Sequence, residues 1–362
     1  MSPLPAPGGP SLPAPRADLA MREGYHSAQV GAEVRLNTNE SPYPPPPEWQ
    51  AELLAEMAGI AWNRYPERAA RALREAIADL HGVRPGQVFA ANGSNEVLQA
   101  LCLAYGGPGR RALTFEPTYA LHAHIAHLTG TAVVQAERAG DFRLDPAAAA
   151  AAVSGVRPAV TFLCSPNNPT GLVEDPETVE AVLRAGPGLL VVDEAYGQFA
   201  ATSALGLVGD ATPLVVCRTF SKTWSLAALR LGYAVAPGEV VGMLERVALP
   251  YHLDAVKQAA GRLALRHRQA MEQRVAGLVA ERERLVAAMA ARPVRVWPSQ
   301  ANFVLFRPEG RAGLDVWKAL VERSVLVRDT SSWPGLDGCL RVTVGTPAED
   351  DRFLAALAEV LT

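Results

Sequence analysis

The sequence has few cysteines and no long hydrophobic run. Its four cysteines, Cys102, Cys164, Cys217 and Cys339, are scattered with no C-x-x-C pair. We therefore expect reduced, buried thiols and a reducing cytoplasm. No apolar run approaches the roughly 18 residues of a membrane span, and the N-terminus lacks the basic-then-apolar order of a secretory signal. A cytoplasmic protein without membrane contact is predicted.

A strong net charge is also absent. The formal charge of -3 gives no general attraction to nucleic acid or to an anionic membrane. The segment "GGPGRR" lacks the lysine and hydroxyl of a phosphate-binding P-loop. His122, His124 and His127 stand close together, but their spacing does not place three ligands on one helix face. No metal site is expected.

The remaining composition is that of an ordinary globular protein, with 49% hydrophobic and 20% charged residues. A chain of 362 residues is too long for one simple core, so two domains are expected. Residues 1–40 would form a disordered Pro-rich tail and an N-terminal arm that packs on the small domain. Residues 41–255 would form a large domain, and residues 256–362 a small C-terminal domain.

Short apolar runs alternate with helical segments through the large domain. Runs such as 159–164, 189–193 and 214–217 have the composition of fully buried strands. An amphipathic pattern at 71–81 predicts a helix that stops at Gly82. The alternation predicts an α/β fold, a parallel sheet wrapped by helices. After a long helical stretch, three strand-like runs with interleaved helix predict a smaller α+β domain.

Polar residues stand at the ends of three of these predicted strands. Asn168 follows the first strand within "SPNNPTG", Asp193 ends the second with Tyr196 close behind, and Ser221 and Lys222 follow the third. Taken one at a time, these are also the features of a tight turn, a helix N-cap and a solvated lysine. Because the carboxyl ends of parallel strands meet at one edge, we expect these residues to form one site.

A fourth cluster lies upstream, where "NGSNE" places Ser94 and Asn95 at the start of an amphipathic helix. The first N–H groups of a helix can bind an anion, although helix capping explains the same residues. Arg230 adds a cation after Lys222. An aldehyde-reactive amine, a carboxylate, amide and phenol groups and an anion cradle are together the contacts that pyridoxal phosphate needs.

Nine segments in this order carry a more specific likeness: "LNTNESPY", "NRYPE", "NGSNE", "EPTYA", "SPNNPTG", "VVDEAY", "SKTWSLAALRLG", "ANFVLF" and "LVRD…CLRVTVGTP". From about Tyr25 to the C-terminus the chain resembles pyridoxal-phosphate-dependent aminotransferases of fold type I, in the histidinol-phosphate aminotransferase branch of class II. The resemblance implies a large domain with a mostly parallel seven-stranded sheet and a smaller α+β domain.

The resemblance also implies roles around the cofactor. Lys222 would form the covalent link to the cofactor aldehyde and, once freed by the substrate amine, move a proton. Asp193 would keep the ring nitrogen protonated, and Tyr119 would stack on the ring. Asn168 and Tyr196 would hydrogen-bond the phenolic oxygen, so the catalytic groups would be Lys222, Asp193 and Tyr196. The cofactor phosphate would be held by Ser94, Asn95, Ser221, Arg230 and, from a neighbouring subunit, Tyr65.

Substrate choice would rest on Arg328 and Arg341, with Tyr25 and Asn37 closing the pocket. Two arginines that face one anion suit a phosphomonoester. The implied reaction is reversible transamination of L-histidinol phosphate with 2-oxoglutarate, which gives imidazole-acetol phosphate and L-glutamate in histidine biosynthesis. A phenylalanine-type aromatic aminotransferase and an amino-acid-phosphate decarboxylase remain alternatives. Tyr65 implies a homodimer with shared active sites. The other expected partners are a small amino donor and a 2-oxo acid, and no nucleic acid is expected.

Overall fold

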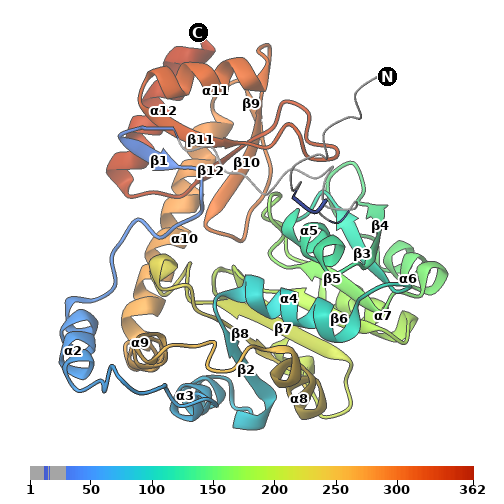
Figure 1. The fold of residues 1–362 in the computed structure, drawn as a ribbon. Helices are drawn as coiled ribbons and strands as arrows, with labels where there is room; N and C mark the ends of the chain where they lie inside the picture. The colour runs from blue at the N-terminus through green and yellow to red at the C-terminus, as the bar shows by residue number, and fades with distance from the viewer. Residues whose placement is uncertain (1–11, 15, 17–29) are drawn as a thin grey trace, which may run out of the picture.

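The computed structural model describes residues 12–14, 16 and 30–362. Figure 1 shows two bodies, each built on its own β-sheet, with the long helix α10 (Arg268–Ala290) running from one to the other. The fold class expected from the sequence, an α/β body with a smaller α+β body, is confirmed. Most of the predicted Pro-rich tail, and Tyr25 within it, lies outside the described residues.

The larger body contains a seven-stranded sheet. Strands β3 to β7 run parallel, and β8 is antiparallel to both of its neighbours. Strands β5 and β6 are buried along their whole length, as their apolar sequences predict. In spatial order the strands are β2 (Val88–Ala91), β8 (Gly232–Val235), β7 (Leu214–Thr219), β6 (Leu189–Asp193), β5 (Val160–Cys164), β3 (Arg111–Glu116) and β4 (Ala132–Glu137).

Helices cover both faces of this sheet (Figure 1). Helix α3 ends at Gly82, whose φ of 64° lies in the left-handed region that glycine adopts freely, so the predicted helix stop is confirmed. The helices described in this body are α2 (Pro47–Ala58), α3 (Arg71–His81), α4 (Ser94–Tyr105), α5 (Leu121–Leu128), α6 (Pro146–Val156), α7 (Pro176–Ala185), α8 (Gly238–Val247) and α9 (Ala255–Arg266).

The smaller body contains a five-stranded sheet whose edge strand comes from the N-terminal arm. Strand β1 pairs in parallel with β11, whereas the other strand pairs are antiparallel. The strands in spatial order are β1 (Val34–Leu36), β11 (Val325–Asp329), β12 (Leu340–Thr343), β10 (Phe303–Pro308) and β9 (Val294–Val296). Two further helices, α11 (Gly313–Glu322) and α12 (Pro347–Leu361), pack on this sheet.

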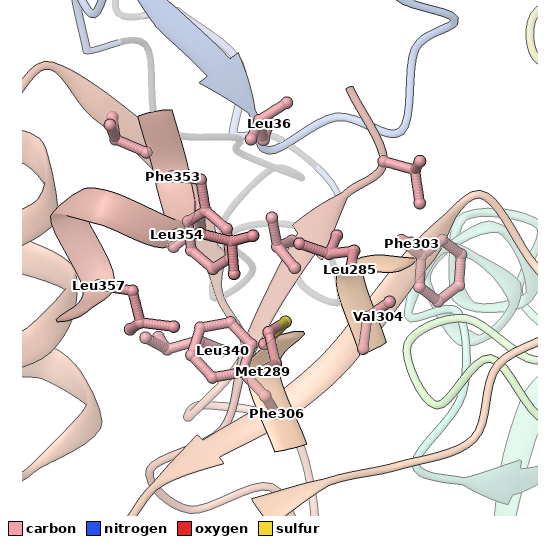
Figure 2. Packing of buried hydrophobic residues seen from close by; sticks show 14 of the residues in the cluster. Leu36, Leu285, Met289, Phe303, Val304, Phe306, Leu340, Phe353, Leu354 and Leu357 are labelled. Carbon is pink, nitrogen blue, oxygen red and sulfur yellow. The ribbon is translucent and has the colours of Figure 1, made fainter. Parts of the chain in front are cut away.

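The arm is part of the core of the smaller body. Figure 2 shows Leu36 beside Phe353 and Leu354 of α12, above a layer that includes Phe306 and Met289. Leu36 is 2% exposed, and burying a leucine side chain stabilises a fold by about 1.5–3 kcal/mol. The arm is therefore anchored to the smaller body by packing as well as by strand pairing, and this fixes the backbone that follows it.

The junction between the bodies is formed by α9 and α10. Helix α9 packs on α2 and α3 of the larger body through buried residues such as Ala260 and Leu263. Helix α10 contributes Leu278, Leu285 and Met289 to the core of the smaller body. In the described part of the chain, no helix combines the length and the apolar character needed to cross a membrane.

Candidate active site

A cavity of about 170 Å³ lies where the carboxyl ends of β5, β6 and β7 approach the N-terminal arm and the smaller body. The structure brings together around it nine of the residues predicted from the sequence: Asn37, Ser94, Tyr119, Asn168, Asp193, Tyr196, Lys222, Arg328 and Arg341. A larger hollow, of about 750 Å³, opens near the amino-terminal ends of the same strands and contains none of the predicted residues. We therefore assign the chemistry to the smaller cavity.

Lys222 enters the cavity from the turn after β7. The preceding Phe220 is fully buried and anchors this turn in the core. The Lys222 amine donates a hydrogen bond of 2.9 Å to the backbone carbonyl of Thr38 in the arm. Burial, reinforced by the nearby positive charge of Arg341, lowers the pKa of Lys222 to about 8. A lysine with this pKa has a substantial neutral fraction near physiological pH and can act as a nucleophile or a base.

Asp193 is the last residue of β6 and is 1% exposed. It accepts a hydrogen bond from the backbone N–H of Ala195, at 3.1 Å, and its other oxygen lies 3.0 Å from Nε2 of His122. Because an ionised carboxylate can only accept, Nε2 carries the proton. The His122 ring stacks on Phe162 with 4.9 Å between the centroids, which fixes its orientation. Asp193 is thus a buried carboxylate, and the His122 imidazole fixes its orientation.

The contact between His122 and Asp193 was not predicted from the sequence. The spacing of His122, His124 and His127 bears only on metal binding, for which it is unsuitable. Among the described residues, no group of three side chains could hold a metal ion. The side chain of His122 is fully buried, whereas His124 is half-buried. A histidine within an otherwise apolar helix face was the available signal, because a buried imidazole needs a hydrogen-bond partner.

The turn after β5 presents Asn168 to the cavity. Its neighbour Asn167 is fully buried and bonds within the loops, to Pro117 and Thr170, so it holds the turn in shape. The Asn168 side-chain oxygen accepts a hydrogen bond from the guanidinium of Arg341. Since the oxygen is engaged in this way, the amide nitrogen of Asn168 is the group left to donate to a ligand.

Arg341 lies on β12 and joins the smaller body to the arm. Its guanidinium donates to the Asn37 carbonyl at 2.9 Å and lies over the ring of Phe303, 5.0 Å from the centroid. Arg328 is its cross-strand partner on β11. Both arginines line the cavity that Lys222 enters.

Tyr196 follows β6 by three positions and is buried, with 5% exposure. Its hydroxyl accepts a hydrogen bond of 2.9 Å from the side-chain amide of Asn39. Burial raises the pKa of Tyr196 well above its ordinary value. The phenol therefore keeps its proton over the physiological pH range and can donate it in a hydrogen bond.

The predicted anion cradle lies at the start of α4. Gly93 precedes the helix with φ of 82°, and no side chain caps the first turn, so the capping role considered for Ser94 and Asn95 is wrong. A Cβ on Gly93 would lie 2.9 Å from the Arg230 guanidinium, and one on Gly232 would lie 2.3 Å from the Ser94 nitrogen. Two glycines thus allow the helix start and the arginine to come together.

Four of the predicted residues do not line the cavity: Tyr65, Asn95, Ser221 and Arg230. Ser221 and Arg230 flank it and are joined by a 3.3 Å hydrogen bond, and Asn95 follows Ser94 in the first turn of α4. Tyr65 is 81% exposed and stacks on Tyr251 at the surface, with 4.5 Å between the ring centroids. Tyr25 lies outside the described residues, so its predicted contact with substrate stays a prediction.

Comparisons with known proteins agree with this site. The family described as "Aminotransferase class I and II" matches residues 32–357. Histidinol-phosphate aminotransferase of Frankia casuarinae is 46% identical over 355 residues, covering 93% of this chain and 88% of the relative. The enzyme of the same name from Thermobifida fusca is also 46% identical, over 351 residues and 94% of each chain.

A solved structure shows the same fold. The crystal structure of histidinol-phosphate aminotransferase from Sinorhizobium meliloti, in complex with pyridoxal-5'-phosphate, superimposes with a TM-score of 0.83 over 91% of both chains, at 24% identity. The family match extends over nearly all of the described chain, and the curated relatives are similar along almost their whole length. The chain therefore belongs to the class I and II aminotransferases and, within them, to the histidinol-phosphate aminotransferases.

Proposed function

We propose that the protein transfers an amino group between L-histidinol phosphate and 2-oxoglutarate, giving imidazole-acetol phosphate and L-glutamate, as a step of histidine biosynthesis. The observation that carries this proposal is the pair of arginines, Arg328 and Arg341, on the wall of the cavity that holds Lys222. A phosphomonoester and a dicarboxylate are both anions that guanidinium groups bind well.

The cofactor of this family is pyridoxal 5'-phosphate. The site fits this cofactor, because Gly93 and Gly232 leave the helix start and Arg230 close together. A Cβ at either glycine would collide with these groups. When bound, the cofactor supplies an aldehyde that condenses with amines and a ring that withdraws electrons from the amine-bearing carbon. Its phosphate would be held by backbone and side-chain groups of Ser94, Asn95, Ser221 and Arg230, with Tyr65 of a second copy adding a contact.

The ring of the cofactor would be oriented by four side chains of the larger body. The Asp193 carboxylate, held by His122, would pair with the ring nitrogen and keep it protonated. The amide nitrogen of Asn168 and the hydroxyl of Tyr196 would donate to the phenolic oxygen, and Tyr119 would stack on the ring. These contacts favour a positive ring nitrogen and a negative phenolic oxygen.

Lys222 would bind the cofactor aldehyde and, once a substrate amine displaces it, move a proton with its Nζ atom. Its pKa of about 8 suits both tasks, since the amine exists in neutral and protonated forms near neutral pH. The Thr38 carbonyl, 2.9 Å from Nζ, would accept a hydrogen bond from the freed amine and limit its movement.

The lining of the cavity favours a phosphorylated donor over an aromatic amino acid. Apart from the two tyrosines, Cys164 and Ala195, its walls are made of amide, hydroxyl, carboxylate and cationic side chains. A phenyl side chain would need an apolar subsite, because burying polar walls against a hydrocarbon ring leaves them without hydrogen bonds. The aromatic alternative therefore remains only as an outcome of the experiment. The decarboxylase, whose substrate also carries a phosphate, is distinguished by the same experiment and not by the lining.

A homodimer with shared active sites is part of this proposal. Tyr65 and Tyr251 stack on the surface near two further exposed apolar side chains, Trp62 at 69% and Leu249 at 74% exposure. Exposed apolar patches of this kind mark protein interfaces. We also place the protein in the cytoplasm, because all four of its cysteines are free, buried thiols, as predicted.

The test is a pair of half-reactions followed by absorbance. Purified holoenzyme should lose its yellow colour when histidinol phosphate is added and regain it with 2-oxoglutarate, whereas Lys222→Ala should do neither. A colour change with phenylalanine but none with histidinol phosphate would favour the aromatic alternative. Release of CO₂ from an amino-acid phosphate without formation of a 2-oxo product would favour the decarboxylase.

A further inference from the structure

Asn39 is a buried polar residue of the arm with a strained backbone. It follows β1 by three positions, is 1% exposed and has φ of 55°. Asparagine is among the few residues besides glycine that tolerate this left-handed conformation. A non-glycine residue held there in a buried site needs surrounding contacts that fix it, and such residues gather at functional sites.

Four hydrogen bonds fix Asn39. Its backbone N–H donates to the Thr343 hydroxyl at 3.0 Å, and its carbonyl accepts from the Asn302 amide at 3.1 Å. Its side-chain oxygen accepts from the Thr343 hydroxyl at 3.0 Å, while its side-chain nitrogen donates to the Tyr196 hydroxyl at 2.9 Å. One residue of the arm is thus tied to the smaller body through Thr343 and Asn302 and to the larger body through Tyr196.

The Thr343 hydroxyl determines which end of the Asn39 amide faces Tyr196. This hydroxyl accepts from the Asn39 N–H and therefore has its own single proton to give to the Asn39 side-chain oxygen. The amide nitrogen is then directed to Tyr196. Because the nitrogen is only a donor, the Tyr196 oxygen must accept, and the phenolic proton is not used by Asn39.

The proton of Tyr196 can then face the cavity. Tyr196 lines the same cavity as Lys222, whose amine lies 5.9 Å from the centroid of the tyrosine ring. A hydroxyl that donated to the arm would have only lone pairs for a ligand. A negatively charged oxygen of the ligand needs a donor at this point.

We propose that Asn39 is a positioning residue that sets the direction of the Tyr196 hydrogen bond, so that the phenolic proton is donated to the phenolic oxygen of the bound cofactor. This inference rests on the proposed function, in which Tyr196 contacts that oxygen. It adds that the contact depends on a residue of the N-terminal arm, which becomes an orienting part of the cofactor site.

Asn39→Asp tests the direction of the bond. The introduced carboxylate can still accept from the Thr343 hydroxyl, but it cannot donate, so the Tyr196 proton should turn to it and away from the cofactor. A donor stabilises the anionic phenolic oxygen, and its loss should raise the apparent pKa of the bound cofactor by about one unit. The measurement is the visible absorbance of the holoenzyme as a function of pH.

Tyr196→Phe and the double variant distinguish two causes of a pKa change in the bound cofactor. One is the lost hydrogen bond from the Tyr196 hydroxyl, and the other is the new negative charge at position 39. Tyr196→Phe should raise the same apparent pKa, and adding Asn39→Asp to it should change nothing further. Asn302→Ala is the matched control, because it removes a bond to the Asn39 carbonyl and leaves the side-chain amide in place. It should lower thermal stability without moving the spectral titration.

Thr343→Val gives a second route if Asn39→Asp does not fold. Without the Thr343 hydroxyl the Asn39 amide can rotate, so we expect a smaller rise in the apparent pKa that again disappears in the Tyr196→Phe background. The proposal is overturned if the titration is unchanged in both Asn39→Asp and Thr343→Val but clearly shifted in Tyr196→Phe. In that case the proposed contact between Tyr196 and the cofactor still holds. A shift that adds to that of Tyr196→Phe also overturns it, since charge alone would then act. No shift in Tyr196→Phe removes the proposed cofactor contact itself, and the inference with it.

Discussion

Arg328 and Arg341 are paired residues on the adjacent antiparallel strands β11 and β12, and both line the cavity that contains Lys222. Directly opposite residues of such a pair place their side chains on the same face of the sheet. Two like charges so close together are unfavourable unless an anion lies between them or other groups bind them. Asn168 and Asn37 hold the Arg341 guanidinium in place, and we propose that Arg341 takes the carboxylate of glutamate while Arg328 takes the substrate phosphate.

Arg328→Gln should therefore act on one substrate more than on the other. We expect kcat/KM for histidinol phosphate to fall about 10–100-fold, the effect of losing a charged hydrogen bond of about 1.5–3 kcal/mol. The half-reaction with glutamate should fall less. Arg323→Gln is the control, because Arg323 pairs with Glu359 on the surface. Equal losses for both substrates would contradict the assignment.

The pKa of Lys222 predicts how the cofactor-free protein takes up pyridoxal phosphate. Burial lowers this pKa to about 8, so the neutral amine that attacks an aldehyde accumulates as pH rises toward 8 and is complete above it. The uptake rate should rise about tenfold per pH unit below pH 8 and then level off. Stopped-flow absorbance measures it, with Nα-acetyl-lysine as the reference amine. A rate that keeps rising to pH 10, as for the reference, would show an unperturbed lysine.

Gly232→Ala should weaken cofactor binding through a steric effect. The new methyl group would lie 2.3 Å from the Ser94 nitrogen, so the start of α4 must move away from the phosphate position. We expect the dissociation constant for pyridoxal phosphate to rise by at least about tenfold, or about 1.4 kcal/mol. Gly86→Ala is the control, because a Cβ there meets no atom within 4 Å. Equal affinities in both variants would show that the cradle does not depend on this close approach.

His122→Phe should slow catalysis while keeping the packing of the ring on Phe162. The variant removes the donor to Asp193 and leaves that carboxylate with only the Ala195 N–H described above. We expect kcat to fall about 10–100-fold, the cost of a hydrogen bond to a charged group. His124→Gln serves as the control on the same helix. If both variants keep full activity, the His122 contact has no role in orienting Asp193.

The strand-end residues of the site could be predicted from the sequence. Asn168, Asp193 and Lys222 each end or follow a run of buried apolar residues, and the register of β5, β6 and β7 brings Cys164, Asp193 and Cys217 side by side. A polar group at the end of such a run lies at the sheet edge whatever the details of the loops. The helix stop at Gly82 was predictable for a similar reason, since only the local conformation decides it.

The residues that orient the site could not be predicted in this way. His122 bonds to a residue 71 positions away, and Asn39 to one 157 positions away. No local period or spacing encodes such contacts, because they depend on how two bodies and the arm pack. The motif "LNTNE" drew attention to Asn37, but its side-chain oxygen has no hydrogen-bond partner among the described residues, whereas Asn39 makes four hydrogen bonds.

The central claim is that the Lys222 amine binds the cofactor, and one measurement tests it directly. The chain has three lysines, Lys222, Lys257 and Lys318, of which only Lys222 lines the cavity. Holoenzyme reduced with borohydride and mapped by mass spectrometry should carry the cofactor on Lys222 alone, with activity lost in proportion to labelling. Cofactor found on Lys257 or Lys318, or full activity after complete labelling of Lys222, would contradict the account.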